Sequence, residues 1–157
     1  MKINEEVLPP FKVAGISART NNADESESSK TKIMPLYKKF FSENIESQIP
    51  DGINKNNFMG LYTDYESDVK GDYTIIICKE VNSLENIPES LNTHDIAEAK
   101  YLKFTDEGEM PGVVINAWKY IWSFFSENKK YERAYTTDFE KYDVTNYNKV
   151  EIYISIK

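Results

Sequence analysis

The stretch NFMGLYTDYESDVKGDYTIIICKEV, residues 57–81, contains two runs of strand-forming residues around a polar turn at 68–72. In the first run, 57–65, Phe58, Gly60 and Tyr62 alternate with Met59, Leu61 and Thr63. The second run, 73–81, is apolar almost throughout. Alternation and a short continuous apolar run are both typical of strands that pack against a core. The stretch therefore predicts two consecutive strands.

A helix and another strand precede this pair. Ile33, Leu36, Tyr37, Phe40 and Phe41 follow the i, i+3, i+4, i+7, i+8 spacing of an amphipathic helix. Before that helix, residues 12–19 read as a strand and residues 21–29 as a polar, acidic loop. After it, a turn is expected at 50–52. The first half of the chain is thus predicted as strand, helix, strand, strand.

The second half repeats this order. The sequence predicts a strand at 96–105, an amphipathic helix at 114–125, and strands at 135–142 and 150–156, after a linker at 82–93. We therefore expect one α+β domain, residues 1–157, with half-repeats at about 1–85 and 90–157. Its fold would be a duplicated β-α-β-β with pseudo-twofold symmetry, an antiparallel sheet with two helices on one face. A central ligand cleft is expected where the halves meet.

The composition narrows the function classes. The net charge is −7 and Arg19 and Arg133 are the only arginines, which argues against a dedicated nucleic-acid surface. One cysteine, Cys78, and one histidine, His94, predict no zinc site or Cys–His dyad, and we expect no cofactor. No signal peptide or membrane span is visible, so the expected location is cytoplasmic.

Glu140 is the candidate functional residue, because it interrupts an aromatic strand. On a buried face its carboxylate would cost several kcal/mol unless a cation or hydrogen-bond donors met it. The chain also carries 11 Tyr and 8 Phe, and Tyr suits pocket walls as well as cores. These observations leave two interpretations open, a solvent-facing acid or the charged centre of an aromatic cleft.

Six motifs in order resemble the GyrI-like small-molecule-binding domain, the effector-binding domain of AraC- and MerR-type transcription regulators. The resemblance covers the whole chain. It rests on FKVAGI at 11–16, YTDY at 62–65, DYTIIICKEV at 72–81, AKYLKFT at 99–105, NAWKYIW at 116–122 and TDFEKY at 137–142.

The resemblance implies the fold predicted above and a function. Members of the family bind amphipathic, often cationic or aromatic compounds in a central cleft, where a buried Glu on a late strand meets the ligand's charge. Glu140 matches that Glu by its place in Phe-Glu-x-Tyr. Cys78 departs from the family, whose members usually carry Gly there. The chain shows no helix-turn-helix segment, so we expect no direct DNA binding.

Five residues are expected to bind the ligand. The half-repeats place Tyr62 opposite Glu140, where a carboxylate and a ring face would both attract a cation. Tyr101 is preferred over Phe104 as a wall because the two point to opposite faces of one strand. Trp122 and Tyr142 complete the set, whereas core packing is expected for Trp118, one turn from Trp122.

Three functions follow, in order of preference. The first is a stand-alone sensor or sequestering protein for amphipathic, cationic aromatic compounds. The second is a hydrolase of reactive small molecules, with Glu140 as general acid or base. The third is a protein-interaction module of the gyrase-inhibitor type, which the family also includes. Because the sequence shows no second catalytic acid and no nucleophile–base pair, we expect binding rather than catalysis.

Overall fold

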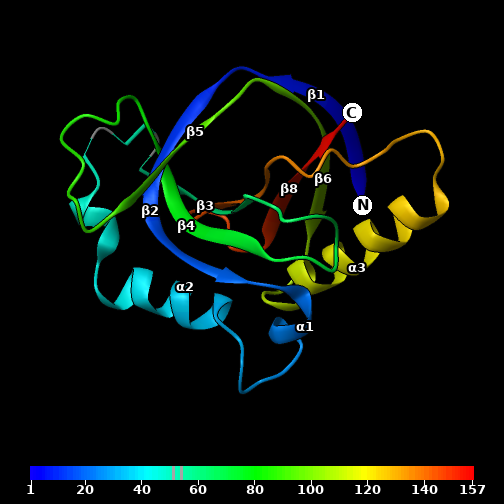
Figure 1. The fold of residues 1–157 in the computed structure, drawn as a ribbon, viewed down its shortest axis with the longest axis horizontal. Helices are drawn as coiled ribbons and strands as arrows, with labels where there is room; N and C mark the ends of the chain where they lie inside the picture. The colour runs from blue at the N-terminus through cyan, green and yellow to red at the C-terminus, as the bar shows by residue number, and fades with distance from the viewer. Residues whose placement is uncertain (51, 54) are drawn as a thin grey trace.

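The computed structural model of the chain describes residues 1–50, 52–53 and 55–157 (Figure 1). The turn predicted at 50–52 includes Asp51, which lies outside these residues. In chain order the elements are β1 (Lys2–Leu8), β2 (Phe11–Thr20), α1 (Asn22–Glu25), α2 (Ile33–Ser42), the short 3-10 helix η1 (Ile45–Gln48), β3 (Asn57–Thr63), β4 (Tyr73–Val81), β5 (Asn92–Ile96), β6 (Ala99–Glu107), α3 (Gly112–Glu127), β7 (Asp138–Asp143) and β8 (Lys149–Ile156).

The strands form one antiparallel sheet whose order shows the predicted duplication. The order is β1-β6-β8-β7-β3-β4-β2-β5. Exchanging β1–β4 with β5–β8 reproduces the same order read backwards. The two halves meet at β3 and β7, where Gly60 pairs with Glu140 and Tyr62 with Asp138. The predicted duplicated α+β fold is therefore confirmed.

Each half contains one strand more than we predicted. β1 precedes β2 but pairs with β6, and β5 precedes β6 but pairs with β2. The halves thus exchange their first strands. Both are edge strands, largely exposed, with the sequences KINEEVL and NTHDI. Edge strands carry polar side chains on both faces, so they lack the apolar alternation that reveals inner strands.

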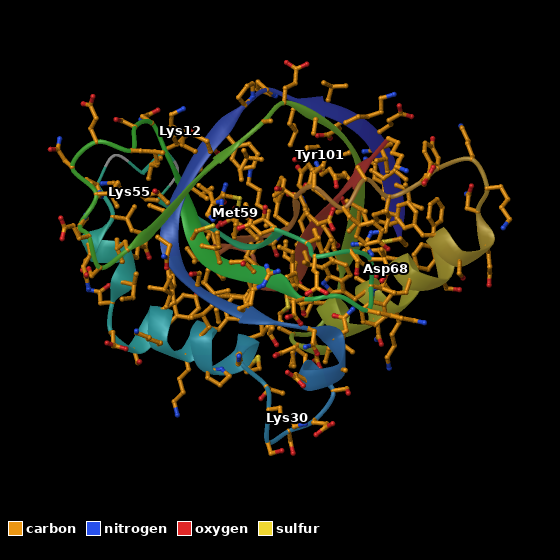
Figure 2. All side chains as sticks on the ribbon, viewed as in Figure 1. Lys12, Lys30, Lys55, Met59, Asp68 and Tyr101 are labelled. Carbon is orange, nitrogen blue, oxygen red and sulfur yellow. The ribbon has the colours of Figure 1, made fainter. Side chains whose placement is uncertain are left out.

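The exchanged strands curl the sheet, and its inner face encloses a separate hydrophobic cluster. Leu8 pairs with Ala99, and Phe11 pairs with Ile96. The two ends of the sheet therefore come together where the chain passes from β1 into β2 and from β5 into β6. Met59 and Tyr101 lie inside this curl, on the side away from the helices (Figure 2). The other members of this buried cluster are Val13, Leu61, Ile76, Cys78, Ile96, Phe139 and Tyr153.

The helices α2 and α3 both pack on the opposite, outer face of the sheet (Figure 1). α2 buries Leu36 and Phe40 against β2 and β4, and α3 buries Ala117 and Ile121 against β6 and β8. Each helix covers one half of the sheet, so the central strands β3 and β7 lie between them. The cleft therefore lies between the two helices, over β3 and β7. No helix in the described part of the chain is long and apolar enough to cross a membrane.

Candidate functional site

A cavity of about 330 Å³ lies between α2 and α3, over the central strands. Its floor contains Glu140 and Tyr142 of β7 and Tyr62 of β3. Its walls come from the two helices and the turn after β7, and include Ile33, Met34, Tyr37, Val114, Ile115, Trp118 and Tyr147. The rest of the wall is apolar or aromatic except for Asp143, Asn146 and Lys149, and Lys149 forms its ion pair with Glu151. The carboxylate of Glu140 is the main polar feature of the floor.

Glu140 is 4% exposed and accepts four hydrogen bonds. Its Oε1 accepts from the Tyr62 hydroxyl at 2.8 Å and from Trp118 Nε1 at 2.5 Å. Its Oε2 accepts from the hydroxyls of Tyr37 at 3.2 Å and Tyr142 at 2.5 Å. A carboxylate has about four lone-pair sites, so these donors occupy all of them. Every donor is neutral.

The local sequence explains how the donors converge. α2 and α3 supply Tyr37 and Trp118 from their sheet-facing sides, while Tyr62 and Tyr142 come from neighbouring strands. Gly60, directly across the ladder from Glu140, leaves the space that Tyr37 enters. A Cβ at position 60 would overlap the Tyr37 hydroxyl and lie 3.2 Å from Glu140 Oε2. The glycine is therefore part of the site.

The three phenols around Glu140 are held in their protonated form. Burial, and after it the charge of Glu140, raise the pKa of Tyr37 and of Tyr62 well above the ordinary value. The same two causes raise the pKa of Tyr142. A tyrosine that keeps its proton keeps donating, so the ring of hydroxyls continues to stabilise the carboxylate at neutral pH.

Asp138, two residues before Glu140 on β7, is the centre of a second polar cluster. It is fully buried, and its Oδ2 accepts from Arg133 Nη2 at 2.7 Å and from the Tyr65 hydroxyl at 2.6 Å. Its Oδ1 accepts from the backbone N–H of Ser155 at 2.7 Å and from the Ser155 hydroxyl at 3.0 Å. Burial opposes the charge of Arg133, but Asp138 outweighs it and raises the pKa of the guanidinium.

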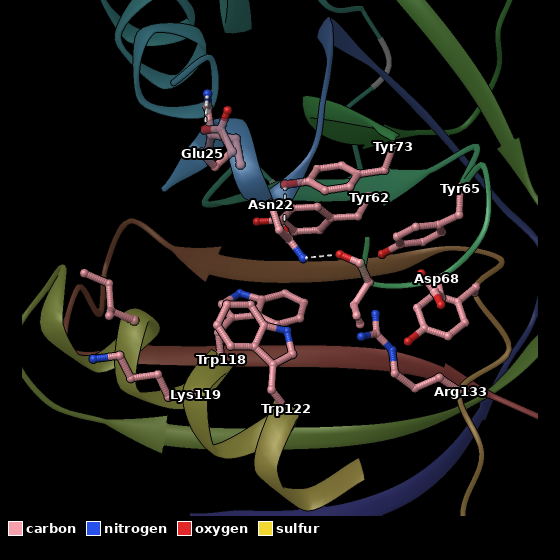
Figure 3. A pocket seen from close by; sticks show the side chains of 14 residues that line it. Asn22, Glu25, Tyr62, Tyr65, Asp68, Tyr73, Trp118, Lys119, Trp122 and Arg133 are labelled. Carbon is pink, nitrogen blue, oxygen red and sulfur yellow. Dashed lines mark hydrogen bonds between the residues drawn. The ribbon is translucent and has the colours of Figure 1, made fainter. Parts of the chain in front are cut away.

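A second cavity, of about 220 Å³, adjoins the first. Tyr62 and Trp118 line both cavities, and their rings are 5.4 Å apart in an edge-to-face contact that separates them. Figure 3 shows Tyr62, Tyr65 and Tyr73 on one side of this second cavity, Trp118 and Trp122 facing them, and Arg133 at one end. Trp122 is 45% exposed.

The structure brings most of the predicted site residues together. Tyr62 and Tyr142 contact Glu140 directly, and Trp122 lines the second cavity. Tyr62 reaches Glu140 diagonally, because its ladder partner is Asp138 rather than Glu140. The expected position of Tyr101 is wrong. Its side chain is fully buried in the inner curl, with Phe139 and Tyr153, on the face of the sheet opposite to Glu140.

Sequence reasoning missed two of the four donors. From the sequence, core packing is expected for Trp118, and Tyr37 is one residue of the apolar stripe of a helix. A signal existed in both cases. The N–H of a buried Trp and the O–H of a buried Tyr need an acceptor, and an acid predicted on the facing strand is the natural one. No group of histidine, cysteine or acidic side chains in the described residues is arranged to hold a metal ion.

Comparisons with known proteins place the chain in a family. A family model described as Cass2, integron-associated effector binding protein, matches residues 5–156. The integron cassette protein VCH_CASS2 of Vibrio cholerae has a similar crystal structure, with 35% identity, a TM-score of 0.84, and coverage of 99% of this chain and 95% of that one.

Two further proteins are similar. The Bacillus subtilis protein YobU, whose name proposes a role as a transcriptional regulator, is 28% identical over 149 residues, 92% of this chain and 91% of its own. SAV2435, solved bound to tetraphenylphosphonium, has a TM-score of 0.79 at 17% identity and shares the fold over 100% of this chain and 94% of its own. The resemblance to GyrI-like effector-binding domains is thus confirmed, and the chain belongs to the Cass2 family of integron-associated effector binding proteins.

Proposed function

We propose that this protein binds amphipathic, cationic aromatic small molecules, with Glu140 meeting the positive charge of the ligand. One observation carries the proposal, namely a buried carboxylate whose four hydrogen-bond donors are all neutral. In the described residues no lysine, arginine or histidine forms an ion pair with Glu140. Its negative charge is therefore solvated by dipoles but left without a countercharge.

A cationic ligand would supply that countercharge. A buried charge is costly until a partner of opposite sign approaches it, and the attraction is stronger in an apolar cavity than in water. The ring faces of Tyr37, Tyr62 and Tyr142 add attraction for a cation of about 0.5–2 kcal/mol per favourable contact. Tetraphenylphosphonium, the compound bound to SAV2435, has both properties that this cavity selects, a positive charge and aromatic rings.

The four donors around Glu140, here called the donor ring, are Tyr37, Tyr62, Trp118 and Tyr142. This donor ring also favours binding over hydrolysis. A general base must accept a proton from a bound water, yet both oxygens of Glu140 already accept two hydrogen bonds from protein groups. A cation, in contrast, is attracted to the carboxylate by charge and needs no free lone pair of Glu140. It can lie against the aromatic walls and interact with the carboxylate through charge alone.

Titration with tetraphenylphosphonium, followed by Trp fluorescence, tests the proposal. The wild type should bind in the micromolar range, about −8 kcal/mol. Glu140→Gln keeps the shape of the side chain and removes its charge, so affinity should fall about tenfold or more. Asp143→Asn is the matched control, because Asp143 is an acid at the mouth of the same cavity and its carboxylate lies outside the donor ring. Equal loss in both variants, or none in Glu140→Gln, contradicts the proposal. Mass spectrometry of the recovered ligand reveals any turnover.

A further inference from the structure

The second cavity has a different polar centre from the first. Glu140 does not line it, and its walls include the rings of Tyr62, Tyr65, Tyr73, Trp118, Trp122 and Tyr135, together with the acids Glu25 and Asp68. Arg133 is at one end, with its side chain 8% exposed (Figure 3). A cavity with aromatic walls and one buried arginine is suited to an aromatic group that carries a hydrogen-bond acceptor.

Arg133 has donors to spare. Its Nη2 donates to Asp138, and its Nε is buried without a hydrogen-bond partner in the described residues. A buried N–H without a hydrogen-bond partner destabilises the folded chain. A guanidinium has five N–H donors and serves two carboxylates readily, because its two edges are separate. The ion pair with Asp138 therefore fixes the position of Arg133 but leaves some of its N–H donors without a partner among the residues that the structure describes.

The surrounding residues hold the guanidinium rigidly. Its Cζ lies 4.3 Å from the centre of the Tyr135 ring, and that ring in turn contacts Tyr65 at 5.5 Å, edge to face. Tyr135 has a φ of 52°, in the left-handed region that non-glycine residues seldom adopt. Such a backbone persists where surrounding contacts impose it. Arg133 is thus a fixed, planar cation rather than a mobile surface charge.

The other charged groups around this cavity are already engaged or exposed. The Glu25 carboxylate accepts from the backbone N–H groups of Lys32 and Ile33, and Asp68 accepts from the N–H of Lys70. Lys119 is exposed on α3. Arg133 is therefore the group that a buried anion in this cavity would meet.

We propose that the second cavity receives the carboxylate of a zwitterionic aromatic ligand, bound by Arg133, while the ligand's cationic part lies at Glu140. The proposal rests on the function proposed above. Asp138, the anchor of Arg133, and Glu140 are two residues apart on β7, and such Cα atoms are about 7 Å apart. That span fits the two ends of one aromatic molecule. Four residues line both cavities, Ile33, Tyr62, Ile115 and Trp118, and the rings of Tyr62 and Trp118 can pack against the ligand.

Two dyes that differ at one group test the proposal. Rhodamine 110 has a cationic xanthene and a free carboxylate, and rhodamine 123 is its methyl ester. The wild type should bind rhodamine 110 about tenfold more tightly, as measured by fluorescence anisotropy at constant salt, because a charge-assisted hydrogen bond is stronger than a neutral one. Equal affinity, or tighter binding of rhodamine 123, overturns the proposal without any variant.

Variants locate the effect. Arg133→Lys keeps the positive charge beside Asp138, so the buried ion pair survives, but loses the second edge of the guanidinium. Affinity for rhodamine 110 should fall about tenfold, and affinity for rhodamine 123 should stay within twofold. Lys119→Met, which removes an exposed cation from the same cavity, should change neither. An equal loss of both dyes in Arg133→Lys overturns the proposal.

The two proposals fail separately. If Glu140→Gln binds both dyes as well as the wild type, the cation site is wrong, whatever Arg133 does. If Glu140→Gln weakens both dyes but Arg133→Lys leaves their ratio unchanged, the cation site stands and the carboxylate site is wrong. Circular dichroism of each variant confirms that it is folded before titration.

Discussion

Glu140 and Asp138 are two buried acids on the same strand, and their surroundings differ in one respect. Each accepts four hydrogen bonds, and neither side chain is more than 4% exposed. Asp138 has the cation Arg133 as one of its four donors, whereas the donors of Glu140 are all neutral. Two acids of similar burial thus differ in whether the protein itself balances their charge.

We interpret this difference as one between a structural acid, Asp138, and the ligand-binding acid proposed above, Glu140. A buried ion pair with satisfied hydrogen bonds fixes the segments it joins, and Asp138 joins β7 to β8 and to the residues before β7. A buried anion without a countercharge adds little to the stability of the fold. The function proposed above gives Glu140 a different role, because a cationic ligand would supply the opposite charge.

The largest effect is expected at alkaline pH and concerns what the two acids share, their tyrosine donors. Burial and the nearby acids raise the pKa of Tyr37, Tyr62, Tyr142 and Tyr65 well above the ordinary value near 10. Above pH 10 the unfolded chain releases these protons while the folded chain keeps them. The contribution of these four tyrosines to the free energy of unfolding is therefore constant below about pH 10. Above it, each such tyrosine lowers that free energy by about 1.4 kcal/mol per pH unit.

Urea denaturation at several pH values between 8 and 12 measures this loss. The share of tyrosinate absorbance near 295 nm that comes from these four buried tyrosines should appear together with unfolding rather than before it. Tyr142→Phe and Tyr65→Phe should each reduce the slope by one tyrosine's share. A free energy of unfolding that does not change between pH 9 and 11 contradicts the assignment of these hydroxyls as buried donors.

Matched amide substitutions at Asp138 and Glu140 test this difference directly. Asp138→Asn leaves Arg133 buried without a countercharge and should lower the free energy of unfolding by about 3–5 kcal/mol. Glu140→Gln should change it by about 1 kcal/mol or less, because it removes an unbalanced charge. The Gln oxygen can still accept from Trp118 and Tyr62, while its NH₂ donates to the hydroxyls of Tyr37 and Tyr142. Urea denaturation at pH 7 measures both. Equal losses would mean that both acids are structural.

The repeated order of elements could be predicted from sequence because it is written in local periodicity. The helices at 33–41 and 114–125 and the inner strands carry apolar stripes of the right period, and these elements are observed as α2, α3 and strands of the sheet. The exchange of β1 and β5 could not be predicted. Neither edge strand has an apolar face, and which strand an edge pairs with depends on contacts far apart in the chain.

The candidate site was predicted in part for the same reason. Glu140 stands out because an acid within an aromatic strand is a local conflict, and such conflicts concentrate at functional sites. Tyr37 and Trp118 agree with the helical pattern, so nothing local distinguishes them from core residues. Their roles depend on how the two helices lie over the central strands, which only the folded structure reveals.

Gly60→Ala tests whether the donor ring needs its exact shape. The added Cβ would overlap the Tyr37 hydroxyl, which must shift and lengthen or lose its hydrogen bond to Glu140. We expect a loss of about 1–3 kcal/mol in the free energy of unfolding and weaker binding of tetraphenylphosphonium. Gly112→Ala is the control, since a Cβ there meets no neighbouring atom. Unchanged binding in Gly60→Ala would show that Tyr37 is dispensable to the site.

The smallest effect is expected at Tyr101, which lies on the other face of the sheet. Its hydroxyl is buried and has no hydrogen-bond partner in the described residues, and burial raises the pKa of this phenol to about 12. Tyr101→Phe removes a donor that is unsatisfied already, so the free energy of unfolding should rise by up to about 1 kcal/mol. Binding of tetraphenylphosphonium should be unchanged, since the inner curl and the cleft are separated by the sheet itself. If Tyr101→Phe weakens binding while stability is preserved, Tyr101 affects the ligand site from the other face of the sheet, and its predicted role in binding stands.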